Sequence, residues 1–551
     1  MKRIITKIKY TAAALCSIVC MSSCEDLLSI VPLNEIVLEN YWENEAEVTS
    51  VVASCYSGIA DGNFITRAML WGEMRSDNMS KGLINPNTPY VNDVQLTEML
   101  EGNILPNYYI ADWSSFYTVI NRCNTVLHYA PEVIERDPDF SESEWLAIEA
   151  EMLTLRALCY FYLVRSFRDV PLVLEPTLDD TAPMQVAAAS PDSVLNQIVE
   201  DLKKAELNAV KEYPPHYNAN VSYTKGRVTK QAVWALLADV YLWMERYDDC
   251  IAYCEKVIEA KVEEAEEDRM SYDGDYPLLA NQKASASNNI HQAYNQIFGT
   301  GNSFESIFEV QIDYVYEDKR NPFRSYYGAF DVDMGALSAS AFLAENTQNG
   351  NDYFAKTDIR PEELFDVEDV NVFSIRKYIT SNVSDDGTPS KRSAAYPNWI
   401  FYRLTDVMLM EAEALVERND SADNDLRIAF NLANAVYRRS NLAAQDKDSL
   451  TFSTYGTQNQ MREFVLLERQ RELMFEGKRW FDLVRKARRE GSNGAMLDLA
   501  KRKYTKPDAV KSKWIKPDML YLPIFEDELK VNTLLVQNPE YETDETVSTA
   551  K

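Results

Sequence analysis

The chain has 551 residues and a formal net charge of −30, with 86 acidic and 56 basic side chains. This negative charge repels the phosphate backbone of nucleic acids, and the chain has no run of basic residues that would offset it. The composition therefore excludes a nucleic-acid partner. The length leaves room for several domains or for one large domain with a big core.

The N-terminal residues 1–23 have the order of an export signal. Basic residues come first, and an apolar run follows from Tyr10 to about Val19. The run is shorter than the roughly 20 apolar residues that a membrane-spanning helix needs. We therefore expect a cleaved leader over 1–23 and a single mature domain over 24–551.

The stretch Met21-Ser22-Ser23-Cys24 resembles a bacterial lipoprotein cleavage box, in which the cysteine thiol receives the lipid. The alternative is an ordinary secretory signal with an incidental cysteine. Two or more acyl chains on Cys24 would anchor the protein stably. Glu25 and Asp26 resemble the acidic tag that sends such lipoproteins to the cell surface, so we expect a lipid-anchored protein of the outer membrane that faces outward.

The remaining cysteines do not indicate a disulfide framework or a metal centre. They are odd in number and scattered along the chain, at Cys55, Cys123, Cys159, Cys250 and Cys254. With only three histidines, the chain has few ligands for a His/Cys zinc site. The sequence therefore predicts neither a metal nor a cofactor.

Four pairs of segments carry helical periodicity. Ser141 and Glu144 have the spacing of a capping box, and Ser190-Pro191 places a cap residue before a first-turn proline. The paired segments are 44–60 with 113–130, 145–168 with 191–210, the two halves of 227–262, and the two halves of 403–440.

The pair at 227–262 fits the tetratricopeptide pattern of large and small packing positions. The residues that fill the pattern are Trp234, Leu237, Ala238, Tyr241, Cys250, Cys254 and Val257. Cys250 and Cys254 then share the face packed between helices, which favours core packing over redox or metal chemistry. The sequence predicts a mainly α fold: a tetratricopeptide-like solenoid of helical hairpins, with large irregular, loop-rich insertions at 61–112 and 263–400.

Several blocks in the right order resemble the SusD/RagB family of outer-membrane nutrient-binding lipoproteins. Gln470 and Phe525 are small departures from the usual pattern. The blocks are LRALCYFYLVRSFRDVPLV (155–173), KGRVTKQAVWALLADVYL (225–242), WIFYRLTDVMLMEAEALVE (399–417), AFNLANAVYRRSN (429–441), LLERQRELMFEGKRWFDLVR (466–485) and LYLPIFEDELKVNTLLVQNPEY (520–541).

The resemblance implies a capture role. Members of the family cover a TonB-dependent transporter barrel, bind glycans or peptides at the surface, release them into the barrel, and are not enzymes. We therefore expect an oligosaccharide ligand and a SusC-like TonB-dependent transporter as partner. Peptide binding within the same architecture is the first alternative, because aromatic and Asp/Asn side chains serve both ligands. An all-helical carbohydrate hydrolase is the second.

The insertion at 67–112 has the composition of a sugar site. Sugar rings offer an apolar face and a rim of hydroxyls, so a site needs aromatic platforms beside planar bidentate groups. The resemblance implies ligand contacts from Asp77, Asn78 and Tyr90, and the composition adds Trp71, Arg75 and Asn92. The alternative for Trp71 and Arg75 is that they pack the loop onto the solenoid.

A second aromatic cluster lies at 313–330. Its candidate ligand contacts are Tyr314, Arg320, Tyr326 and Tyr327. The alternation of Tyr314 and Tyr316 favours a strand or an extended edge. The cluster otherwise fills the core of the insertion or faces the transporter.

Two further patterns favour structure over chemistry. Glu468 and Arg471, Glu476 and Arg479, and Asp482 and Arg485 are each three residues apart, as in a helix laced by ion pairs. The acidic stretches 273–275 and 331–333 lack the full spacing of a calcium-binding loop and favour solvated turns. The chain has no nucleophile elbow, Walker loop or zincin helix, so no catalytic residue is predicted.

Overall fold

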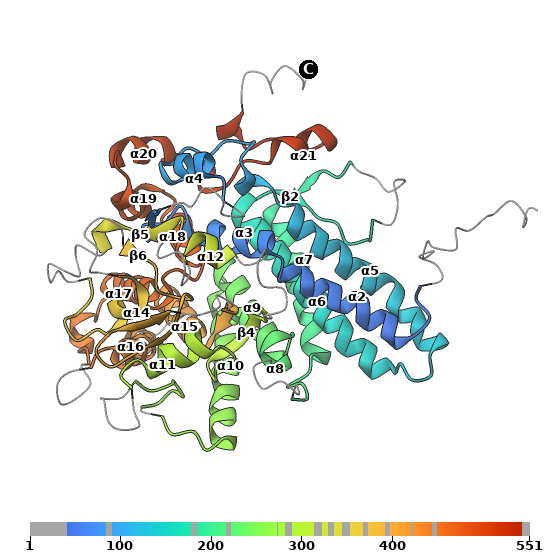
Figure 1. The fold of residues 1–551 in the computed structure, drawn as a ribbon, viewed down its shortest axis with the longest axis horizontal. Coiled ribbons are helices and arrows are strands. Elements are labelled where there is room, and N and C mark those ends of the chain that lie inside the picture. The colour runs from blue at the N-terminus through green and yellow to red at the C-terminus, as the bar shows by residue number, and fades with distance from the viewer. Residues whose placement is uncertain are drawn as a thin grey trace, which may run out of the picture.

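A computed structural model describes the greater part of the chain as a helical scaffold joined to a part built of short strands and loops (Figure 1). The described residues are 41–83, 91–177, 185–215, 222–272, 274–281, 289–312, 322–328, 335–343, 353–366, 373–391, 397–419, 422–442 and 449–542.

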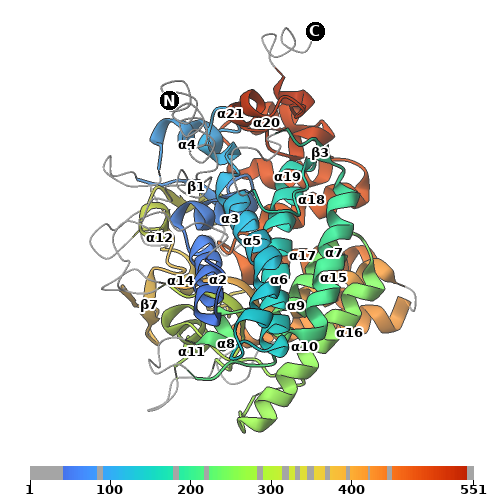
Figure 2. The same ribbon diagram turned by 90° about the vertical axis from the view of Figure 1, so that its right-hand side faces the viewer.

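The scaffold consists of helix pairs at the positions that the sequence predicts. The pairs are α2 (Glu45–Ile59) with α5 (Ser114–Arg136), α6 (Glu142–Phe167) with α7 (Pro191–Asn208), α9 (Lys230–Trp243) with α10 (Tyr247–Glu267), and α15 (Leu404–Arg418) with α16 (Ala422–Ser440). Successive pairs pack through α5 on α6, α7 on α9, and α10 on α15, so they form one continuous array (Figure 2). The prediction of a mainly α, solenoid-like fold is confirmed.

The helix starts follow from their capping residues. The Ser141 side chain accepts a hydrogen bond from the Glu144 backbone N–H, and Glu144 accepts one in return from the Ser141 backbone N–H. Ser190 caps α7, and Pro191 occupies the first turn, where a missing N–H costs nothing. Both predicted starts are confirmed.

The two cysteines of α10 lie in the core. Cys250 and Cys254 are both fully buried, with their Sγ atoms 4.0 Å apart, on a helix that packs against α9 and α15. This confirms the prediction that they are packing residues.

The first insertion is more regular than expected. It contains α3 (Gly62–Glu73), β1 (Met79–Lys81), α4 (Asp93–Leu100) and the short helix η3 (Tyr109–Ala111). Every residue of α3 except Asn63 is buried. A helix that is buried on all sides has no polar face, so its sequence lacks the periodicity by which a surface helix is recognised.

The second insertion consists of short elements in several small sheets. Its strands are β4 (Ser306–Val310), β5 (Leu337–Ala339), β6 (Phe373–Ser374), β7 (Thr380–Val383), β8 (Pro389–Lys391) and β9 (Trp399–Arg403). Its helical turns are α11 (Gln292–Tyr294), η4 (Asn295–Thr300), α12 (Pro322–Tyr326) and α14 (Arg360–Leu364). Among the described strands, β5 lies between β1 and β6, β4 pairs with β9, and β7 pairs with β8, all antiparallel. A further small sheet pairs β2 (Val170–Pro171) with β3 (Ala188–Ala189).

The C-terminal part adds helices that close over α3 and α15. They are α17 (Gln458–Leu473), α18 (Arg479–Glu490), α19 (Gly494–Ala500), α20 (Pro507–Trp514) and α21 (Glu526–Val531), with short turns at η6 (Phe452–Thr454), η7 (Lys501–Lys503), η8 (Pro517–Leu520) and η9 (Pro539–Tyr541). Between α17 and α18 the backbone passes so close to α3 that a Cβ on Gly72 would lie 1.8 Å from the Gly477 carbonyl oxygen. Only glycine permits this approach.

Two of the three ion pairs predicted from the spacing in α17 and α18 are present. Arg471 pairs with Glu468 at 2.7 Å and Arg485 pairs with Asp482 at 2.6 Å, as predicted. The expected contact between Glu476 and Arg479 is wrong, because the chain leaves the helix between α17 and α18. Glu476 instead binds Lys377 and Arg403, on the neighbouring insertion.

These ionic groups lie in the interior. Glu472 contacts Arg360, Arg403 and Arg439, all of them buried. A buried charge is tolerated only when it is paired and hydrogen-bonded, and here several cations share one carboxylate. The block 466–485 therefore holds the second insertion to the helical scaffold.

Candidate functional site

The two insertions meet in one small sheet. Strand β1 of the first insertion pairs antiparallel with β5 of the second, with Met79 opposite Ala339 and Lys81 opposite Leu337. The Gly82 N–H donates to the Ala336 carbonyl at 2.8 Å and extends the pairing. We name the region formed by residues 79–83, 91–97 and 335–343 the insertion edge; its exposed residues are Lys81, Leu83, Asn92, Asp93, Val94 and Ala341. It is the candidate site, because both predicted ligand-binding segments adjoin it.

Contacts behind the insertion edge hold the two insertions together. The Tyr326 hydroxyl donates to the Tyr109 hydroxyl at 3.0 Å, and the Ser340 hydroxyl donates to the Asp77 carbonyl at 2.5 Å. Arg67 joins the beginning and the end of the first insertion, because its guanidinium donates to the Asp112 carboxylate at 3.0 Å and to the Tyr109 carbonyl at 3.1 Å. The edge is therefore built on a rigid support.

The outer side of the insertion edge carries both apolar and polar groups. Leu83 is 52% exposed and Val94 is 67% exposed. Beside them the Lys81 ammonium bonds the Thr97 hydroxyl at 2.6 Å and the Asp93 carboxylate at 3.0 Å. Exposed apolar and hydrogen-bonding groups thus stand together here, as the amphipathic surface of a sugar requires.

Asn92 is the predicted ligand contact that the structure places on this surface. It is exposed, and its side chain accepts a hydrogen bond from the Gln95 backbone N–H at 3.2 Å, which caps α4. The Asn92 amide N–H₂ group remains free of this capping bond. Tyr90, two residues earlier in the chain, lies outside the described residues, as do Tyr314 and Arg320.

Asp77 and Asn78 lie in the core, against the expectation that they contact a ligand directly. Both are fully buried. Asn78 donates to the Glu73 carboxylate at 2.5 Å and accepts from Gln470 at 2.7 Å. Burial alone would raise the pKa of Asp77, but its ion pair with Arg479 holds that pKa below the ordinary value. Their bonding capacity is used inside the protein.

Trp71 and Arg75 are also buried, so the packing alternative for these two residues is correct. The Trp71 indole N–H donates to the Ile110 carbonyl at 2.8 Å. Arg75 donates to the Leu520 carbonyl at 2.8 Å, and its guanidinium lies 4.3 Å from the centre of the Trp480 ring. They fasten α3 to the rest of the protein and leave no group for a ligand at the surface.

Tyr326 and Tyr327 support the site from within, in accord with the core alternative for the second cluster. Both rings are buried. The Tyr327 hydroxyl donates to the Phe475 carbonyl at 2.9 Å, while Tyr326 holds Tyr109 as described above. Both belong to or follow α12, which packs against α3. Neither ring is exposed for stacking on a sugar.

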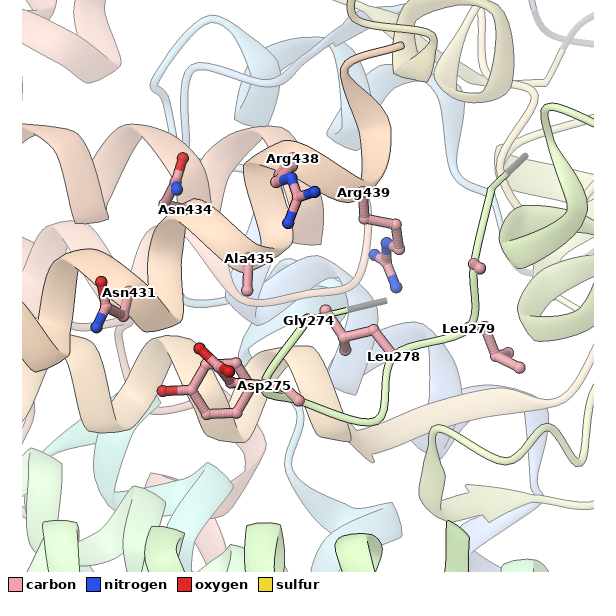
Figure 3. Close-up of a pocket in the computed structure, with 11 residues that line it drawn as sticks. Gly274, Asp275, Leu278, Leu279, Asn431, Asn434, Ala435, Arg438 and Arg439 are labelled. Carbon is pink, nitrogen blue, oxygen red and sulfur yellow. The ribbon is translucent and has the colours of Figure 1, made fainter. Parts of the chain in front are cut away.

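A small pocket lies apart from the insertion edge, between α16 and residues 274–280 (Figure 3). Figure 3 shows Asn431, Asn434 and Arg438 on the helix side of this pocket. Its volume is about 110 Å³. Ligand pockets typically measure about 300 to 1,000 Å³, so this one is too small for a sugar ring.

The acidic stretches 273–275 and 331–333, which the sequence offers as alternatives for calcium binding, lie only partly within the described residues. Asp273 and residues 331–333 lie outside the described residues. Within the described ranges, no group of three or more His, Cys, Asp or Glu side chains is arranged to hold a metal ion. In the same part of the chain, no helix has the length and apolar character needed to cross a membrane.

Comparisons with known proteins identify both halves of the chain. A family model described as the SusD family matches residues 245–541. A second model, described as "Starch-binding associating with outer membrane", matches residues 33–242. The two matches do not overlap, and together they span the described part of the chain except residues 243, 244 and 542.

Curated relatives agree with these matches. "SusD-like protein P25" of Formosa agariphila is 25% identical over 550 residues, covering 94% of this chain and 95% of the relative. "SusD-like protein P38" of the same organism is 23% identical over 501 residues, covering 87% and 91%.

Solved structures share the fold. A SusD superfamily protein from Bacteroides vulgatus has a TM-score of 0.67 at 20% identity, covering 91% of this chain and all of that one. A structure described as a laminarin-binding SusD-like protein has a TM-score of 0.61 at 22% identity, covering 90% of this chain and all of the other. With more than half of its length matched by one family model, the chain belongs to the SusD family.

Proposed function

We propose that the protein is a surface lipoprotein that binds an oligosaccharide at the insertion edge and hands it to a TonB-dependent outer-membrane transporter. The observation that carries the proposal is the family match over both halves of the chain, one of them to a model described by starch binding and the outer membrane. The laminarin-binding structure of the same fold lends further support.

The insertion edge is the preferred place for the ligand because of its chemistry. Leu83 and Val94 offer apolar surface, and Lys81 and Asn92 offer hydrogen-bond donors within the same small area. Tyr90 is close to Asn92 in the sequence and supplies an aromatic ring of the kind on which sugars stack. We propose Tyr90 and Asn92 as ligand contacts, with Tyr314 and Arg320 of the second insertion as further candidates.

The mechanism is capture without bond breaking. The buried contacts behind the edge, such as Tyr326 to Tyr109, hold it in one conformation. When the binding surface is already formed, less free energy is lost in ordering its side chains and loops on binding. The carboxylates of the block 466–485 are engaged in ion pairs inside the protein, which is the arrangement of a structural element and not of an acid and base facing a cleft.

Attachment to the membrane is proposed to occur through the Cys24 thiol. This residue follows the predicted leader directly, and the two acids after it suit export to the cell surface. Residues 24–40 would then link the lipid to the first described residue, Tyr41. Lipid anchoring keeps the binding surface close to a transporter in the same membrane.

Glycan capture is tested by affinity electrophoresis of the purified protein in gels that contain starch or laminarin. We expect slower migration in at least one glycan gel than in a glycan-free gel. Incubated oligosaccharides should be recovered at full length. Shorter products would support the hydrolase alternative, and binding of peptides without any glycan would support the peptide alternative.

The transporter partnership is tested by purification from native outer membranes. A tagged form of the protein, solubilised in mild detergent, should bring down a TonB-dependent transporter in a fixed ratio. The identity of the neighbouring genes provides an independent check, because a transporter gene next to this one is expected. Recovery of the protein alone under conditions that preserve other membrane complexes would contradict this part of the proposal.

A further inference from the structure

A second and larger pocket lies between α16, α17 and residues 354–356, in the region of α16 and α17 at the lower left of Figure 1. Its volume is about 650 Å³, within the range of about 300 to 1,000 Å³ found for ligand sites. None of the residues that line it belongs to the insertion edge. We propose that this pocket is a second saccharide site, which binds a sugar ring of the glycan; the inference rests on the proposed glycan-binding function.

The floor of the pocket is aromatic. The lining includes Phe354, Tyr437 and Phe464, all of them buried. Tyr455 is half-buried and stacks on Phe464, with ring centres 4.4 Å apart and planes 27° apart. One face of the Tyr455 ring is thus supported by Phe464, which holds the ring at a fixed angle in the pocket wall.

The pocket also offers polar groups that nothing else in the described protein uses. Within the described residues, neither the Tyr455 hydroxyl nor the Lys356 ammonium has a hydrogen bond or an ion pair. Lys356 is exposed at the mouth, together with Asn459 and Gln460 in the first turn of α17. The Tyr455 hydroxyl and the Lys356 ammonium therefore remain available to a ligand, whereas the side-chain oxygens of Asn459 and Gln460 already accept hydrogen bonds from Arg462 and Thr457.

This combination suits a sugar better than a wholly apolar ligand. An apolar ligand filling the pocket would take the Tyr455 hydroxyl away from water without giving it a partner, and such desolvation of a polar group opposes binding. A sugar presents an apolar face to the aromatic floor and hydroxyls to Tyr455, Lys356 and Asn459. Two further charged residues line the pocket: Arg471, which pairs with Glu468 at 2.7 Å, and Glu463, which pairs with Lys486 at 3.2 Å.

Two substitutions on one short helix provide a matched test. Thr454 lines the pocket, and its neighbour Ser453 does not, although both side chains are exposed on η6. Thr454→Trp should fill the mouth of the pocket, while Ser453→Trp adds the same ring outside it. Equal melting temperatures of the two variants and the parent would show that the comparison concerns binding alone.

The readout is the methyl NMR signals of Leu450 and Leu467, which both line the pocket. The full-length protein in detergent is titrated with maltohexaose and with laminarihexaose, fragments of starch and laminarin. We expect saturable shifts of both leucines with at least one glycan in the parent and in Ser453→Trp, and none in Thr454→Trp. Tyr455→Phe should weaken the same titration about three- to tenfold through loss of the hydroxyl.

The failure of this inference can be told apart from failure of the proposed function. If calorimetry detects glycan binding while the Leu450 and Leu467 signals stay unchanged in the parent, the second site is wrong and the proposed function stands. If Thr454→Trp keeps the parental shifts, the pocket is likewise not the site. If neither glycan binds by any readout, and a wider glycan panel also fails, both proposals are wrong.

Discussion

Asp77 and Arg479 form a fully buried ion pair across 402 residues of sequence. The Arg479 Nε donates to Asp77 Oδ1 at 2.9 Å and its Nη2 donates to Oδ2 at 3.2 Å. This two-bond geometry is the strong form of an arginine–carboxylate contact. It ties the first insertion, just before the insertion edge, to the start of α18.

Asp77→Ala should destabilise the protein by about 3 to 5 kcal/mol, because it leaves the Arg479 charge buried without a partner. The measurement is urea unfolding followed by circular dichroism. Asp139→Ala, at an exposed aspartate, is the control and should stay within about 0.5 kcal/mol of the parent. An Asp77→Ala variant that unfolds like the parent yet loses glycan affinity would show that Asp77 serves the ligand after all.

His291 should make the stability depend on pH. Its ring is buried and contacts Glu363 at 2.8 Å and Glu362 at 3.1 Å. Burial alone would lower the pKa of His291, but the hydrogen bonds and charges of the two glutamates raise that pKa from 6.5 to about 9. The folded protein therefore holds this proton more tightly than the unfolded chain does.

The contribution of this proton to stability is complete below pH 6.5 and is lost as the pH rises through 9, with a total on the order of 3 kcal/mol. The free energy of unfolding should decrease between pH 6 and pH 9.5, and this decrease should be larger in the parent than in His291→Gln. His128→Gln, at a half-exposed ring, is the matched control and should keep the parental difference. An equal fall in the parent and in His291→Gln would contradict the assignment.

Cys250→Ser and Cys254→Ser should each lower the free energy of unfolding by an amount on the order of 1 kcal/mol, because each places a hydroxyl in a fully buried position. The glycan affinity should stay at the parental value. Denaturant titration and calorimetry on the same samples measure both quantities. A changed affinity in a variant with parental stability would conflict with a core role for α10.

Cys24→Ala should leave the folded domain intact and release it from the membrane, because lipid attachment is the only role proposed for this thiol. Labelling of growing cells with a radioactive fatty acid, followed by fractionation, is the measurement. Cys55→Ala, at a buried cysteine, is the control for general effects on export. Label and outer-membrane association that persist in Cys24→Ala would refute the lipoprotein proposal.

The helical scaffold could be predicted because its signals are local. Ser141 with Glu144, and Ser190 with Pro191, mark helix starts within four residues of sequence. The packing positions around Cys250 repeat with the period of one helix pair. Each of these features is fixed by neighbours in the chain, so a sequence pattern suffices to find it.

The burial of the predicted ligand residues could not be foreseen, because their partners are distant in sequence. Asp77 pairs with Arg479, and Asn78 bonds Gln470; both partners are about 400 residues away in the sequence. Aspartate and asparagine are mostly exposed in proteins, so their residue types agreed with the ligand contacts that the family resemblance implied. The pocket beside Tyr455 was missed for a similar reason, since its lining comes from separate stretches that carry no common motif.

The central claim is glycan capture at the insertion edge, and calorimetric titration of Tyr90→Ala tests it most directly. The glycan is the one that retards the protein in affinity gels, and Tyr223→Ala, at an exposed tyrosine outside both insertions, is the control. Loss of a stacking ring should reduce affinity about tenfold or more in Tyr90→Ala alone, with parental circular dichroism and melting temperature. Parental affinity in Tyr90→Ala, or an equal loss in Tyr223→Ala, would contradict the account.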